Sequence, residues 1–174
     1  FFTLPKDFSS GRVLLHFGAV DYHCVVEINS VTVGANKGGY YPFSFDITDA
    51  LKKGENEIKV TVSDPGDTST QARGKQKTKR GGIWYTPQSG IWQTVWMENV
   101  PASYIESIKI IPDIDSDTLY VKVNMNEGYQ DALVKVFDSG KQLLETKLLR
   151  GEGIVKLKEY QLWSPENPKL YDLV

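Results

Sequence analysis

Cysteine and histidine are scarce in this sequence, which contains one cysteine and two histidines in 174 residues. A single cysteine excludes an intrachain disulfide, and these counts argue against a structural zinc site. Cys24 alternates with Val26 and Ile28, which predicts a buried, unreactive thiol on the apolar face of a strand. His16 has no partner at metal-ligand spacing, so we interpret it as an ordinary strand residue. The sequence therefore predicts no metal site.

A strong net charge and a long apolar run are also missing. The formal net charge is −2, so no global electrostatic field attracts nucleic acid or a membrane surface. No apolar run approaches the roughly 20 residues that a membrane-spanning helix needs. We therefore expect neither a nucleic acid nor a membrane as partner.

Catalytic and cofactor motifs are absent as well. No glycine-rich phosphate loop follows a strand and opens a helix, and there is no G-x-S-x-G nucleophile elbow. We therefore predict no cofactor. The acidic residues are scattered over turns and strand ends and form no obvious acid/base pair. Two carboxylates far apart in the sequence can still meet in space.

The sequence does contain many stretches in which apolar and polar residues alternate. This pattern predicts an all-β protein. Between these strands we expect a two-residue hairpin turn at Asn29-Ser30 and a loop over Gly34–Gly39. Thr48 and Gly54 bracket one expected helical turn, with Thr48 as its cap. The strands expected in the first half are Val13–Phe17, His23–Ile28, Val31–Val33, Tyr41–Ile47 and Asn56–Val62.

The stretch 81–97 holds three of the four tryptophans and divides into a loop half and a strand half. The strand half, 91–97, is bulky on both faces and predicts a strand covered on both sides, with Trp92 and Trp96 in the core. Trp84 and Tyr85 belong to the loop half. For them a core plug and a platform facing a sugar or partner are both open.

A long polar loop over 63–82 precedes this stretch, and loops of such length are usually functional or disordered. Five of the eight residues from Arg73 to Arg80 are basic. A solvated, mobile loop is the simpler interpretation. The short patch and the small net charge argue against nucleic-acid binding.

Pro101 marks a boundary, after which shorter strands and turn signals indicate a sandwich of immunoglobulin type. The chain starts at Phe1 as if inside a strand and stops in another alternating pattern. We therefore expect a fragment of a longer protein. The strands expected after the boundary are Tyr104–Ile111, Leu119–Asn124, Leu133–Phe137, Gln142–Leu149, Gly153–Leu157 and Leu170–Val174.

Five motifs in order give the chain a family resemblance. They are Phe17-Gly-Ala-Val-Asp-Tyr22, Gly38-Gly-Tyr40 with Pro42-Phe-Ser-Phe-Asp-Ile-Thr48, Arg73-Gly-Lys-Gln76, Ser89-Gly-Ile-Trp-Gln-Thr-Val-Trp96 and Leu162-Trp-Ser-Pro-Glu-Asn-Pro168. With these motifs the chain resembles glycoside hydrolase family 2, which contains β-galactosidases, β-glucuronidases and β-mannosidases. The resemblance extends over nearly the whole sequence.

The resemblance implies a galactose-binding-like jelly-roll β-sandwich followed by an incomplete immunoglobulin-like β-sandwich. Residues 1–101 are similar to the jelly roll without its N-terminal strand or strands. Residues 102–174 are similar to the immunoglobulin-like domain without its last strand. A TIM barrel follows these domains in the family and carries the two catalytic glutamates, so no glutamate here inherits those roles.

For function, the resemblance implies a non-catalytic portion of a retaining hydrolase of terminal β-glycosides, with β-galactosidase as first choice. The chain would brace the barrel, lend a loop to its substrate pocket and itself be inactive. The implied partners are a carbohydrate and the intramolecular barrel, and homo-oligomers are common in the family. A stand-alone carbohydrate-binding or adhesion module is the alternative, because fold does not fix function.

The resemblance also implies which residues approach substrate. A loop before the Ser-Gly-Ile motif contacts the terminal sugar in several relatives, some of which use an acidic residue six positions before the motif glycine. Trp84 stands there in this sequence, so that carboxylate contact does not carry over. A tryptophan can instead stack on a sugar or wall the pocket. The candidate substrate-proximal residues are Arg73, Gln76, Trp84 and Tyr85.

Overall fold

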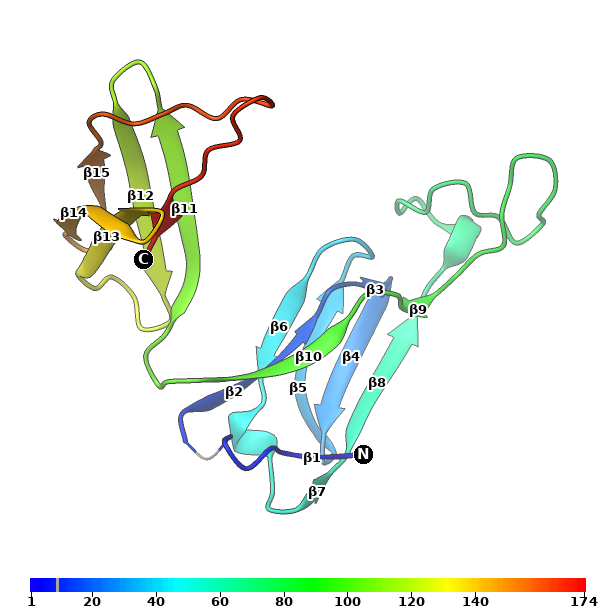
Figure 1. The fold of residues 1–174 in the computed structure, drawn as a ribbon. Helices are drawn as coiled ribbons and strands as arrows, with labels where there is room; N and C mark the ends of the chain where they lie inside the picture. The colour runs from blue at the N-terminus through cyan, green and yellow to red at the C-terminus, as the bar shows by residue number, and fades with distance from the viewer. Residues whose placement is uncertain (9) are drawn as a thin grey trace. The chain divides into compact units, whose positions relative to one another are not determined.

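The computed structural model describes residues 1–8 and 10–174 and consists almost entirely of strands (Figure 1). The described chain forms two compact units, Phe1–Ala102 and Ser103–Val174. The predicted all-β class is confirmed. That the first domain lacks its N-terminal strand or strands, and the second its last strand, stays a prediction. None of the helices in the described residues has the length and apolar character of a membrane-spanning segment.

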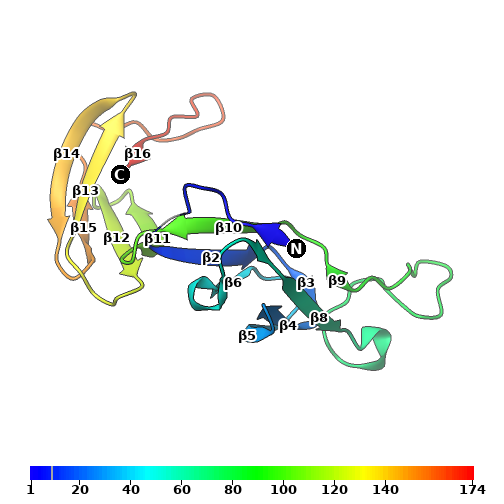
Figure 2. The same ribbon diagram turned by 90° about the horizontal axis from the view of Figure 1, so that it is seen from below.

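The first unit is a β-sandwich built around two three-stranded sheets, ordered β10-β2-β6 and β5-β4-β8 (Figure 2). Two small two-stranded sheets, β1-β7 and β3-β9, complete it. Its elements are β1 Phe2–Thr3, β2 Arg12–Phe17, β3 Val20–Asp21, β4 His23–Ile28, β5 Val31–Lys37, β6 Phe43–Asp46, β7 Glu55–Asn56, β8 Ile58–Ser63, β9 Gly90–Ile91, β10 Val95–Val100 and the 3-10 turns η1 Thr48–Ala50 and η2 Gly66–Thr68.

The core of this unit lies between β2 and β4, as their alternation predicts. Val13, Leu15 and Phe17 of β2 are buried, and Cys24, Val26 and Ile28 of β4 pack into the same cluster. Burial raises the pKa of the Cys24 thiol, which keeps it in its unreactive protonated form. The predicted burial of this thiol is therefore confirmed.

The turn at Asn29-Ser30 has the predicted hairpin form, with φ values of 50° and 68°. The loop predicted over Gly34–Gly39 is wrong in its first part, because β5 runs on to Lys37 and pairs with β4 up to that residue. Close packing requires a glycine at position 34, since a Cβ there would lie 2.1 Å from the Phe45 ring. A glycine that looks like a loop signal is thus a packing requirement inside a strand.

The helical turn after Thr48 exists as η1, but Thr48 does not cap it. The Thr48 hydroxyl accepts a hydrogen bond from the Val13 backbone N–H at 2.9 Å and donates to Asp46. Thr48 therefore ties η1 to β2. Asn56, predicted in one strand with Ile58, lies in β7 and is fully buried, with its amide bonded to Asn29 and Lys52.

Trp96 does not lie in the core, so the prediction that both faces of its strand are covered is wrong. Trp96 pairs with His16 across β10 and β2 and shares the outer face of the sheet with it. The two rings stack with centroids 4.8 Å apart, and Trp96 stays 43% exposed. Alternation decides which face a side chain occupies, but not whether another layer covers that face.

The second unit is a sandwich of two three-stranded sheets, ordered β11-β12-β15 and β14-β13-β16. Every strand predicted here is present, with ends shifted by a few residues. Val121, Val134, Val136 and Leu148 are central to its core. The strands are β11 Ile105–Asp113, β12 Thr118–Met125, β13 Ala132–Asp138, β14 Lys141–Leu148, β15 Glu152–Lys156 and β16 Asp172–Leu173.

Candidate functional site

A pocket of about 420 Å³ lies in the first unit where β3 and β9 pair. Its walls come from strand ends and from the loop before β9, so residues distant in the sequence meet there. The lining residues are Asp21, Tyr40, Gln76, Gln88, Ser89, Gly90, Ile91 and Trp92. Loops and strand ends held by a rigid sandwich are common places for binding groups.

The short β3-β9 pairing positions the acidic group of the pocket. Val20 pairs with Ile91 and Asp21 with Gly90. Val20 is fully buried and anchors β3 in the core, while Asp21, at its end, lines the pocket. The strand predicted over 91–97 is interrupted between β9 and β10, where the Gly18 N–H donates to the Thr94 carbonyl at 2.8 Å. This interruption separates the pocket wall from the sheet strand β10.

Asp21 is an acceptor held in a poorly solvated place. The residue is 8% exposed, and no described residue offers a hydrogen bond to its Oδ1. Burial raises the pKa of the Asp21 carboxyl above its ordinary value, and the nearby charge of Asp64 raises it further. A buried acceptor without a donor is costly to the fold, so it indicates a place where a ligand hydroxyl completes the arrangement.

Gly39 leaves room for this carboxyl, since a Cβ on Gly39 would lie 2.6 Å from Asp21 Oδ1. The Gly39 carbonyl accepts a hydrogen bond from the Trp92 indole N–H at 2.7 Å. Trp92 also meets Tyr40 edge to face, with centroids 6.0 Å apart, and is 51% exposed. The prediction that Trp92 is a core residue is therefore wrong, because its polar edge fixes it at the pocket mouth.

The loop side of the pocket is held by polar contacts. The Gln88 backbone N–H donates to Gln76 Oε1 at 2.6 Å, and the Ser89 hydroxyl donates to Asp64 Oδ2 at 2.6 Å. Asp64 Oδ1 accepts the Gly66 N–H at 2.9 Å, so both oxygens of Asp64 serve the loop. Asp64 and Asp21 are therefore not a matched acid/base pair.

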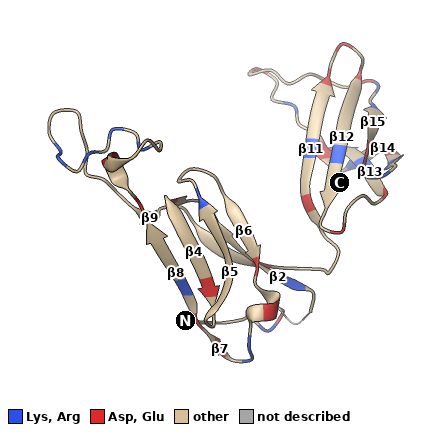
Figure 3. Cartoon of the chain, turned by 180° about the vertical axis from the view of Figure 1, so that it is seen from behind, with Lys and Arg blue, Asp and Glu red and all other residues tan. Residues whose placement is uncertain are grey.

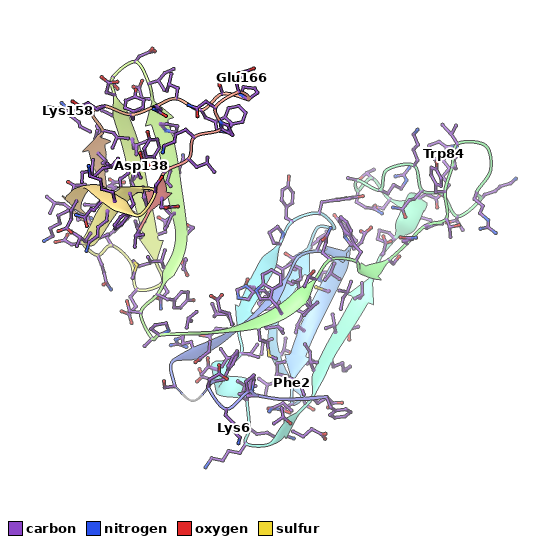
Figure 4. The ribbon with its side chains drawn as sticks, viewed as in Figure 1. Phe2, Lys6, Trp84, Asp138, Lys158 and Glu166 are labelled. Atoms are coloured by element: carbon purple, nitrogen blue, oxygen red, sulfur yellow. The ribbon has the colours of Figure 1, made fainter. Side chains whose placement is uncertain are left out.

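The predicted candidates Arg73, Gln76, Trp84 and Tyr85 lie at different places in this loop. Gln76 lines the pocket, and the other three are outside the set of lining residues. Tyr85 pairs with Gln76 in a parallel bridge and is 69% exposed, so it is not a core plug. Trp84 is half-buried and carries Lys77 Nζ over its ring at 4.0 Å (Figure 4). The Arg73 guanidinium donates to the Ser69 carbonyl at 3.1 Å.

Asp21, Tyr40 and Trp92 line the candidate site, and reasoning from the sequence did not select them as site residues. Each belongs to one of the motifs that carry the family resemblance, which is the signal available for them. These residues come together because β3 pairs with β9. Each of these strands is two residues long, which is too short to produce a recognisable sequence pattern.

The pocket combines a carboxyl acceptor, amide groups, a hydroxyl and an aromatic edge, the groups that bind sugar hydroxyls and sugar faces. A single available carboxyl cannot supply the two carboxylates that glycoside hydrolysis needs. Within residues 1–8 and 10–174 there is no cluster of three or more His, Cys, Asp or Glu side chains that could hold a metal ion. The arrangement fits binding rather than bond cleavage.

Two family models match the chain and together span it. Residues 1–104 match the model described as glycosyl hydrolase 2 galactose-binding domain-like. Residues 103–174 match the model of glycosyl hydrolases family 2.

Curated relatives include a β-glucuronidase of Paenibacillus borealis, 27% identical over 99% of this chain and 31% of that protein. A β-galactosidase of Thermoanaerobacter pseudethanolicus is 26% identical over 99% of this chain and 24% of that protein. The solved β-glucuronidase from Ruminococcus gnavus in complex with D-glucuronic acid has a TM-score of 0.77 at 23% identity. The match covers 99% of this chain and 32% of the glucuronidase chain, and it shows that the two share a fold. The chain thus spans about a third or less of the length of these relatives.

Proposed function

Because the chain belongs to glycoside hydrolase family 2, we propose that it forms the accessory β-sandwich portion of a longer enzyme that hydrolyses terminal β-glycosides. The catalytic carboxylates of this retaining enzyme lie in a barrel outside residues 1–174. The chain braces that barrel and contributes one wall of the substrate pocket. β-Galactosides are the proposed substrates, with β-glucuronides as the second candidate because relatives of both kinds match the chain.

The observation that carries this proposal is the pocket at β3 and β9, with Asp21 as its unpartnered acceptor. In this proposal Asp21 accepts a hydrogen bond from a hydroxyl of the terminal sugar, while Gln76 and Ser89 border the same sugar. Trp84 and Tyr85 extend the wall along the loop, and Arg73 holds the loop through Ser69. All of these groups bind and orient, which raises the effective concentration of substrate at the carboxylates of the barrel.

Hydrolysis of aryl β-galactoside, β-glucuronide and β-mannoside by the full-length protein tests this proposal. We expect one of the first two to be the preferred substrate. Trp84→Ala and Arg73→Ala are each expected to lower kcat/KM on it by roughly 3- to 10-fold, since each removes a contact worth about 1 kcal/mol. Val31→Ala, an exposed change on β5, serves as control with unchanged kcat/KM. Failure to cleave any of the three glycosides would refute the proposed activity.

A further inference from the structure

The loop beside the pocket carries an unbalanced charge that the proposed function does not use. Residues 68–97 contain no Asp or Glu, while Arg73, Lys75, Lys77, Lys79 and Arg80 lie within eight positions. The chain as a whole has a net charge of −2. Figure 3 shows the Lys and Arg positions along this extended loop. A basic segment on an acidic chain gives a local field that attracts anions.

None of these five cations forms an ion pair within 4 Å of a carboxylate in the described part of the chain. A nearby carboxylate is that of Asp67, whose pKa is lowered by a hydrogen bond from Thr78 and, more weakly, by the charge of Arg73. Cations of the neighbouring strands do, as Arg12 does with Asp46 and Lys59 with Glu27. The Arg73 Nε is buried without a hydrogen-bond partner, and an Arg80 guanidinium nitrogen donates only to the neutral Thr86 hydroxyl at 3.0 Å. Unpaired cations held at one place are available for an anionic ligand.

Backbone contacts fix this basic segment relative to the pocket. The Tyr85 N–H donates to the Lys75 carbonyl at 2.7 Å, and the Lys77 N–H donates to the Tyr85 carbonyl at 3.1 Å. Gln76, between the two lysines, reaches the pocket and bonds to Gln88. Lys75 and Lys77 flank Gln76 in the sequence, and none of the five basic residues is among those that line the pocket. The cations therefore form a rim beside the pocket and are not part of its lining.

We propose that segment 73–80 is an anion-binding subsite for a glycan whose terminal sugar occupies the neighbouring pocket. It takes a carboxylate or sulfate group carried by that glycan, and this assignment rests on the proposed function. Lys and Arg bind both groups through charge-assisted hydrogen bonds. The Trp84 ring, with Lys77 over one face, adds an aromatic surface for a sugar ring.

The two sides of the pocket then have opposite preferences. Asp21 accepts hydrogen bonds from hydroxyl groups and repels an anion, whereas the rim attracts one. A glycan with a neutral, hydroxyl-bearing face and one charged group is oriented by both. Nucleic acid fits less well, because its phosphates run along a whole strand and the basic patch is eight residues long beside a carboxyl.

The test uses the full-length protein and the triple variant Lys75→Gln/Lys79→Gln/Arg80→Gln. Lys77 is kept because it contacts Trp84. Two matched substrate pairs are compared: a uronic-acid oligosaccharide with its neutral hexose counterpart, and a sulfated oligosaccharide with its desulfated form. We expect the wild type to favour the charged member and the variant to lose on the order of 10-fold in kcat/KM for it at low salt. An effect in either pair supports the subsite and identifies the anionic group.

The matched control removes three exposed charges elsewhere in the first unit, as Lys6→Gln/Lys52→Gln/Lys53→Gln. Figure 4 labels Lys6 and Trp84 at opposite ends of that unit. The control is expected to leave all four substrates unchanged, and added salt should reduce only the wild-type preference for charge.

Three results would overturn the subsite: equal kcat/KM for charged and neutral members, equal losses in both triple variants, or competition by an oligonucleotide as strong as by the charged glycan. In each of them, continued cleavage of a neutral aryl glycoside leaves the proposed function standing. Loss of all hydrolysis by the wild type refutes the proposed function itself, so the two failures are distinguishable.

Discussion

Replacing Asp21 by alanine in the full-length protein is expected to lower kcat/KM on its preferred aryl glycoside on the order of 100-fold. A hydrogen bond between a charged acceptor and a substrate hydroxyl is worth roughly 1.5–3 kcal/mol, and a tenfold change is about 1.4 kcal/mol. Steady-state kinetics at several substrate concentrations measures the loss. Asp7→Ala, an exposed change in the same unit, should leave kcat/KM unchanged.

Asp21→Asn separates binding from a purely structural role. The folded protein raises the pKa of Asp21, so ionised Asp21 destabilises the fold. This penalty is absent below the ordinary carboxyl pKa of about 3.9, grows as the pH rises from there to the raised pKa, and is complete above it. The asparagine variant should therefore have a higher Tm than the wild type at neutral pH, a difference that vanishes on acidification, while its kcat/KM falls. A variant that is both less stable and less active would make Asp21 a structural residue.

Phe17→Ala is expected to lower the free energy of unfolding of the first unit by about 3–5 kcal/mol. Phe17 is completely buried and stacks on Phe43 with centroids 5.0 Å apart, so truncation leaves a cavity in the core between β2 and β4. Urea unfolding followed by tryptophan fluorescence measures the change. Phe1→Ala removes a ring that is 81% exposed and should cost less than about 0.5 kcal/mol. Equal costs for the two variants would contradict the burial of β2.

Much of the fold could be predicted because burial on one face leaves a period of two in the sequence. Val13, Leu15 and Phe17 predict β2 in this way, and Asn29-Ser30, two turn residues between two apolar runs, predict the hairpin that joins β4 and β5. The end of β5 could not be predicted, because Gly34 suggests a loop. The structure shows that a side chain at this position would clash with the Phe45 ring of another strand. The exposure of Trp96 could not be predicted for a similar reason. Whether a second layer covers a face of a strand depends on elements far away in the sequence.

The site was less predictable than the fold. Gln76 could be selected because its motif resembles the family, and it does line the pocket. Asp21 gives no local signal: one acidic residue at the end of an apolar stretch looks like a solvated turn. The role that we propose for it rests on the pairing with Gly90, on the space at Gly39 and on the missing donor at Oδ1. These are long-range facts that a pattern of neighbouring residues does not contain.

Hydrolysis of an aryl β-glycoside by residues 1–174 alone, measured beside the full-length protein, tests the central claim most directly. We predict cleavage with retention by the full-length protein and none by the isolated chain, because Asp21 is the one pocket carboxyl available to substrate and catalysis requires two. Turnover by the purified 174-residue chain would contradict this account, since it would place a complete catalytic pair within the two sandwiches.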